Sequence, residues 1–174
     1  SYNTAMGFDA LYANSTGQEN TAIGAYALHE NTTGLQNTAI GSYAMFYQSF
    51  SNNGISWNSG NTAVGYQALY RNQPTDVYNG INNTAIGSLS LRNNTNGTEN
   101  TGLGYNVLNA NTTGSQNTAF GNEALRGNID GISNVSMGYM SLANNSIGNV
   151  NTALGSFSLS SSSTGDFNVA VGYK

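Results

Sequence analysis

A five-residue motif recurs along the whole chain at an almost fixed interval. It reads Asn, then Thr or Val, then a small residue, a large apolar residue and Gly, and it begins at Asn3, Asn20, Asn37, Asn61, Asn83, Asn100, Asn117, Asn134, Asn151 and Asn168. Seven of the nine intervals are 17 residues long, and the third and fourth are 24 and 22 residues. This regularity indicates a repeat protein in which each repeat is one structural unit and the longer intervals contain insertions.

A unit of 17 residues is too short for a helix pair or a propeller blade, but it suits one coil of a β-solenoid with two short strands and two tight turns. We number the positions of each coil from its motif Asn, which is position 1. Gly recurs at position 5 and usually at position 15, and these glycines interrupt any helix. We expect the N-T-T-G segments, as at 31–34 and 111–114, to be turns in which Gly adopts positive φ, with strand elsewhere. The sequence thus predicts one all-β repeat domain over residues 1–174, with about ten coils.

Side chains alternate across a strand, so positions 3 and 4 must face opposite ways. We expect position 3 to fill a narrow interior with Ala5, Ala22, Ala39, Ala63, Ala85, Ala119 and Ala153. Position 4 then forms an outward apolar stripe of Met6, Ile23, Ile40, Val64, Ile86, Leu103, Phe120, Met137, Leu154 and Val171. We expect Ala27 and Leu28, at positions 8 and 9, to repeat this opposition. A large exposed apolar stripe typically marks an interface, which predicts an oligomer with the stripe at its axis.

The asparagines serve the structure in this interpretation. The position 1 side chains are expected to form a ladder of stacked amides that hydrogen-bond from coil to coil. Glycosylation sequons such as those at Asn31 and Asn111 arise because N-T-T belongs to the repeat, and we do not interpret them as modified sites.

Composition excludes several classes of function. With no Cys and one His, the chain can form neither a disulfide nor a Cys/His zinc site, and His29 is expected to be an exposed residue of a return segment. Four Lys and Arg against eight Asp and Glu cannot build a basic face for nucleic acid. No apolar run is long enough to span a membrane. The carboxylates form neither a calcium motif nor a glycosidase pair, so we expect no catalytic residue, no metal, no cofactor and no enzymatic activity.

The two long intervals are consecutive, so we expect insertions at 46–60 and 70–82 to emerge side by side and touch. They contain the only Trp, the only Pro and several aromatic residues among Asn, Gln, Asp and Arg, a composition typical of a sugar or protein recognition surface. Packing under the loops is the alternative role for the aromatic side chains. The candidate ligand-binding residues are Trp57, Tyr70, Arg71, Asp76, Tyr78 and Tyr47.

The best preserved units, 20–36 and 100–116, read N-T-A-I-G-x-x-A-L-x-x-N-T-T-G or close to it. This unit resembles the head repeat of YadA-like trimeric autotransporter adhesins, and more closely the N-T-A-I-G arrays of phage tail fibres and bacterial surface fibres. The resemblance covers all ten units, although the coil is longer than in the adhesin heads. It implies a left-handed parallel β-roll and a homotrimer with an adhesive role outside the cell. The implied trimer interface contains Ile23, Ile40, Val64, Ile86, Leu103, Phe120 and Leu154.

The sequence therefore predicts a structural and adhesive segment of a trimeric fibre, on a bacterial surface or a virion tail. Its expected partner is a cell-surface glycan or protein of a host or prey cell, bound through the insertions. Because the chain starts inside a repeat, we expect it to be a fragment of a longer fibre. The alternative is an ice-binding β-solenoid, because Thr recurs at position 2 on a scaffold of low charge.

Overall fold

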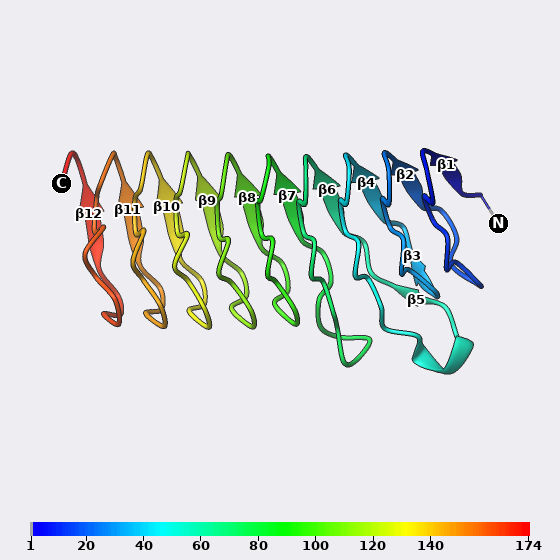
Figure 1. The fold of residues 1–174 in the computed structure, drawn as a ribbon. Coiled ribbons are helices and arrows are strands. Elements are labelled where there is room, and N and C mark those ends of the chain that lie inside the picture. The colour runs from blue at the N-terminus through cyan, green and yellow to red at the C-terminus, as the bar shows by residue number, and fades with distance from the viewer. Residues whose placement is uncertain (1) are drawn as a thin grey trace.

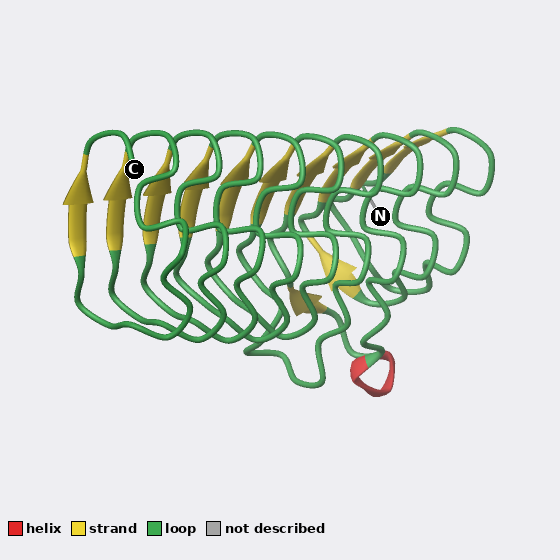
Figure 2. Ribbon diagram, turned by 60° about the vertical axis from the view of Figure 1, so that its left-hand side comes forward, coloured by secondary structure: helices red, strands yellow, loops and turns green. Residues whose placement is uncertain are grey.

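The computed structural model describes residues 2–174 as a parallel β-solenoid. Each of the ten coils contributes one three-residue strand to a single ten-stranded sheet (Figures 1 and 2). The strands pair in register, so that Thr21 lies beside Thr38, Ala22 beside Ala39 and Ile23 beside Ile40. In sheet order they are β1 Thr4–Met6, β2 Thr21–Ile23, β4 Thr38–Ile40, β6 Thr62–Val64, β7 Thr84–Ile86, β8 Thr101–Leu103, β9 Thr118–Phe120, β10 Val135–Met137, β11 Thr152–Leu154 and β12 Val169–Val171. The predicted all-β solenoid of about ten coils is confirmed.

The expectation of two strands in every coil is wrong. Outside the main sheet, the described strands are β3 (Gly34–Leu35) and β5 (Trp57–Asn58), which pair with each other, and the short 3₁₀ turn η1 spans Asn52–Gly54. The rest of each coil consists of turns that hydrogen-bond to the neighbouring coil. The Leu28 amide, for example, donates to the Ala44 carbonyl at 3.0 Å. The turns thus continue the stack without extended backbone.

Residues with positive φ, not a second strand, close the coil. They recur at positions 7, 9 and 17, as in Tyr26 (60°), Leu28 (51°) and Gln36 (61°). The expectation that the N-T-T-G glycine has positive φ is wrong, because Gly34 does not adopt a positive φ. Gly34 is required by space, since an added Cβ would lie 2.5 Å from Oδ1 of Asn31.

Gly at position 5 is required by both conformation and space. Gly24 has φ +126°, and an added Cβ would lie 2.7 Å from the carbonyl carbon of Gly41 in the next coil. A side chain here would force adjacent coils apart, because the atoms of Gly41 that it would meet belong to the backbone and cannot move aside.

The interior holds the side chains of positions 3, 8 and 9. The position 3 alanines from Ala22 to Ala153 are fully buried as expected, whereas Ala5 is exposed at the end of the stack. The expected opposition of positions 8 and 9 is wrong, because Ala27 and Leu28 are both fully buried. The left-handed conformation of Leu28 interrupts the alternation of an extended strand, so two successive side chains turn inward. Leu or Met at position 9 therefore supplies the bulk of the core.

The expected amide ladder at position 1 is confirmed. The Asn37 amide N–H donates to Oδ1 of Asn20 at 2.9 Å, and Nδ2 of Asn37 donates to the same oxygen at 3.0 Å. Nδ2 of Asn20 also donates to the carbonyl of Gly34 across its own coil at 2.9 Å. Each Asn thus joins the next coil and closes its own.

A second amide ladder runs through position 12, and the sequence analysis missed it. Nδ2 of Asn111 donates to Oδ1 of Asn94 at 2.7 Å and to the Gly114 carbonyl at 2.8 Å, and Nδ2 of Asn128 donates to Oδ1 of Asn111 at 2.7 Å. Gln48 substitutes for Asn in the third coil and accepts from Asn72. Asn31 and Asn111 are fully buried in this ladder, so their sequons are inaccessible in the folded chain.

Substitution of Asn111 by Ala should lower the free energy of unfolding by about 3 kcal/mol, because it leaves the buried Oδ1 of Asn94 without a donor and removes the hydrogen bonds to the Gly114 carbonyl and from Asn128. The measurement is urea-induced unfolding followed by circular dichroism. Asn122→Ala, at an exposed position of the seventh coil, is the control and should shift the midpoint little. Equal effects of the two substitutions would contradict a stabilising role for the second ladder.

Candidate functional site

The outer face of the ten-stranded sheet carries two parallel columns of side chains. Position 2 forms a threonine column, interrupted by Val135 and Val169, and position 4 forms an apolar column with one large residue from every coil. Among the residues expected at a trimer interface, Ile40, Ile86 and Leu103 are 38%, 38% and 44% exposed, and Ile23, Val64, Phe120 and Leu154 are half-buried. All seven lie in the apolar column. The outward direction of this stripe, expected from strand alternation, is confirmed.

The insertions are shorter than the interval lengths indicated. Gln48 and Asn72 still occupy position 12 of the third and fourth coils and join the buried ladder, so regular coil continues through 46–48 and 70–72. The segments that project are 49–56 and 73–79, and Figure 1 shows them as the loops that extend below the other coils.

Each projecting segment has its own set of contacts. The first bends toward the first coil, where Oγ of Ser56 donates to the Thr16 carbonyl at 3.0 Å. The second is held by its own turn, in which Oδ1 of Asn79 accepts from the Thr75 amide at 2.9 Å. Within the predicted bounds of 46–60 and 70–82, the insertions touch in the part that is still regular coil. There the Tyr47 amide donates to the Tyr70 carbonyl at 3.0 Å.

Trp57 packs beneath the first insertion. Its side chain is 5% exposed, and its ring centroid lies 5.5 Å from that of Phe50 in an edge-to-face arrangement. Strand β5 also pairs Trp57 with Gly34 of the preceding coil. Of the two roles that the sequence left open, the structure places Trp57 in packing, where it is not presented to a ligand.

Aromatic rings form a ladder on the turn side of the first four coils. At position 10, ring centroids are 5.1 Å apart for Tyr12 and His29, 4.8 Å for His29 and Phe46, and 5.7 Å for Phe46 and Tyr70. His29 is stacked within this ladder, so its expected exposed position is wrong. Tyr26, Tyr43 and Tyr47 pack alongside, and we call this set the aromatic patch: Tyr12, Tyr26, His29, Tyr43, Phe46, Tyr47 and Tyr70.

Two arginines border the aromatic patch at its far end. The guanidinium carbon of Arg92 lies 5.3 Å from the ring centroid of Tyr70, and Arg71 is adjacent in the chain. The structure therefore brings together Tyr47, Tyr70 and Arg71 from the predicted ligand-binding set and adds Arg92, which the sequence analysis missed. The missed signal was the recurrence of large planar side chains at position 10 of successive coils.

Asp76 and Tyr78 lie apart from this group, on the second projecting segment. Tyr78 is 81% exposed, and its amide donates to Oδ1 of Asp76 at 3.2 Å, which stabilises the turn. These two predicted residues are accessible, but they share no contact with the aromatic patch that would form a single site.

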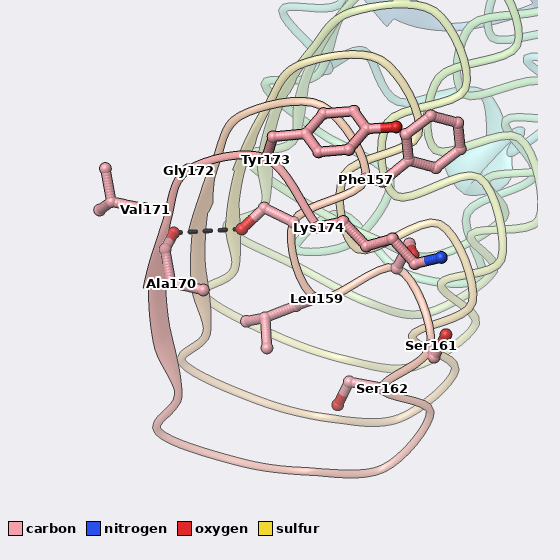
Figure 3. A pocket seen from close by; sticks show the side chains of 11 residues that line it. Phe157, Leu159, Ser161, Ser162, Ala170, Val171, Gly172, Tyr173 and Lys174 are labelled. Atoms are coloured by element: carbon pink, nitrogen blue, oxygen red, sulfur yellow. Dashed lines mark hydrogen bonds between the residues drawn. The ribbon is translucent and has the colours of Figure 1, made fainter.

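A hollow of about 490 Å³ lies at the C-terminal end of the stack (Figure 3). It is the uncovered side of the ninth coil, lined by Phe157, Leu159, Tyr173 and several serines, and Oγ of Ser158 donates to the Ala170 carbonyl there at 3.2 Å. The lining contains the ammonium of Lys174 and no Asp, Glu or His side chain.

Within residues 2–174, no three His, Cys, Asp or Glu side chains gather where they could hold a metal ion. No helix in that range is long and apolar enough to cross a membrane. No family model, curated protein or solved structure matches this chain.

The burial of Trp57 predicts its fluorescence, because it is the only tryptophan. Emission of the native protein should be blue-shifted and weakly quenched by acrylamide, and it should shift to the red on unfolding in urea. Strong quenching in the native state would show that the indole faces solvent and return Trp57 to the candidate ligand-binding residues.

The pKa of Tyr70 is raised above the usual value for tyrosine, first because burial disfavours the phenolate and then because the Tyr47 hydroxyl lies beside it. Arg92 and Arg71 oppose this shift. The unfolded chain therefore releases this proton first as pH rises, so native stability should fall above about pH 10. Tyr70→Phe should lessen this loss in urea unfolding measured across alkaline pH, and an unchanged pH profile would contradict the assignment.

Proposed function

We propose that this chain is a structural and adhesive segment of a trimeric surface or tail fibre that recognises a cell-surface glycan or protein. The observation that supports the proposal most directly is the apolar column, to which every coil contributes one large side chain. Soluble monomers rarely expose continuous apolar patches of this length, and such patches commonly mark interfaces.

The geometry of the sheet suits association along its full length. All ten strands are parallel and in register, so the apolar column keeps one orientation from the first coil to the last. Copies arranged side by side around an axis parallel to the solenoid would bury equivalent residues at every coil, and closed symmetry would leave no apolar column uncovered. Three copies and a left-handed roll follow from the resemblance to trimeric fibre repeats.

Recognition belongs in this proposal to the surfaces that interrupt the regular coils. Asp76 and Tyr78 extend from the scaffold on the second projecting segment, and the group of Tyr47, Tyr70 and Arg71 lies at the base of both insertions. Loops and side chains held on a rigid scaffold are common binding surfaces. The proposed location is therefore extracellular, on a bacterial surface or a virion.

Ice binding is the second candidate, and the threonine column is the observation that favours it. Seven consecutive coils place Thr at position 2, from Thr4 to Thr118, on one face of a parallel sheet. Neighbouring hydroxyls would then repeat at about the 4.8 Å spacing of paired strands. This face is the proposed interface, so the two functions require opposite states of the same surface. Thermal hysteresis from a monomer would favour ice binding.

Multi-angle light scattering should give a mass three times 18.2 kDa. The double variant Ile86→Glu and Leu103→Glu should be monomeric, because two carboxylates in each chain would then be buried at the axis. Ile147→Glu is the matched control, since Ile147 is exposed but lies outside the sheet. A monomeric unmodified chain, or dissociation by the control variant alone, would refute association through the apolar column.

A further inference from the structure

Two of the four basic side chains lie on adjacent coils without an acidic partner. The backbone amide of Arg71 donates to the carbonyl of Arg92 at 2.9 Å. The ion pairs formed among residues 2–174 are His29–Glu30 and Arg126–Glu123, and neither includes Arg71 or Arg92. In a chain with eight acidic residues and a net charge of −4, this pair of guanidinium groups is available to an external anion.

The side chain of Arg92 is already held in place. Its Nε donates to Oε1 of Gln67 at 2.8 Å, and its guanidinium lies over the ring of Tyr70. Its Nη1 also donates to Oδ1 of Asn93 at 3.5 Å. A guanidinium has five N–H donors, so these two bonds leave three donors for a ligand. An arginine fixed in this way loses less conformational freedom when a ligand binds.

The aromatic patch beside these arginines exceeds what the coil requires for stability. In the sixth, eighth and ninth coils, position 10 is occupied by Asn109, Ala143 and Ser160, and those coils stack in the same sheet. Rings at this position are confined to the first four coils, next to Arg71 and Arg92. Phenol groups combine apolar surface with a hydrogen-bonding tip, so they can pack against a sugar ring while binding its hydroxyls.

We infer that Arg71, Arg92, Tyr47 and Tyr70 form a binding site for an acidic saccharide, in which the arginines bind a carboxylate or sulfate group, Tyr47 contacts the sugar ring and Tyr70 holds the Arg92 guanidinium in place. This inference rests on the proposed function, for which it names the class of ligand and places recognition on the coils at the base of the insertions. A polynucleotide suits the site less well, because its many phosphates would face Glu30 on a neighbouring coil and an acidic protein overall.

A glycan array tests the site directly. The array carries sialylated, uronic-acid-containing and sulfated oligosaccharides, each beside its neutral parent, and the full chain is applied at low and high salt. We expect binding to acidic members, none to their neutral parents, and weaker binding as salt increases. For the best ligand, titration calorimetry should show that Arg92→Gln and Arg71→Gln each reduce affinity about tenfold or more.

Arg126→Gln is the matched control, because Arg126 occupies the same coil position as Arg92 but pairs with Glu123 at 2.7 Å. It removes the same charge and should leave affinity unchanged. The site is refuted if no acidic saccharide binds, if neutral parents bind equally, if the control loses as much affinity, or if single-stranded DNA displaces the glycan. Light scattering on each variant shows whether its assembly is intact. If the unmodified chain is a trimer but binds no acidic saccharide, this site alone is refuted. If the unmodified chain is a monomer, the trimeric fibre is refuted.

Discussion

The stacking of buried asparagine amides is the interaction on which the solenoid depends. The coils contain little regular strand, and their cores hold mainly one Leu or Met with two small residues, so hydrophobic burial per coil is modest. The ladders at positions 1 and 12 bind the backbone of each coil and the side chain of its neighbour at once. Identical amides at one spacing leave few buried polar groups unpaired, which is a condition for placing them inside a protein.

The same constraint explains the strict length of the repeat. A coil can gain residues only where its backbone leaves the stack, which is after position 12 and before the next motif. Both insertions begin there, after Gln48 and Asn72, which are joined to each other and to Asn94 in the second ladder. Gly24 and its equivalents add a further constraint, because adjacent backbones approach too closely for a Cβ. The stacked part of each coil, up to position 12, therefore makes the solenoid stiff, and the part after position 12 accepts insertions.

How much could be predicted from the sequence follows from these constraints. The period, the single sheet, the buried position 3, the outward position 4 and the first ladder follow from spacing and alternation. The prediction from strand alternation that Leu28 faces away from Ala27 was wrong. Left-handed conformations of non-glycine residues have no clear sequence signal and depend on the neighbouring coil. In the candidate site, composition singled out Tyr47, Tyr70 and Arg71 but not Arg92, 21 residues further on, because only the stacked coils place it over Tyr70.

The division between invariant and variable positions bears on function. Positions that face inward or meet the next coil repeat with few changes, whereas positions 6, 7, 10 and 11 carry rings in some coils and Asn, Ser or charged groups in others. A scaffold that stacks equally well with either places no stability requirement on those side chains. At positions 10 and 11 the rings occur only in the first four coils, beside unpaired arginines, and recognition of a ligand is the cause that we propose for this clustering. The apolar column differs in kind, because it recurs in every coil and suits a partner as long and regular as the solenoid itself.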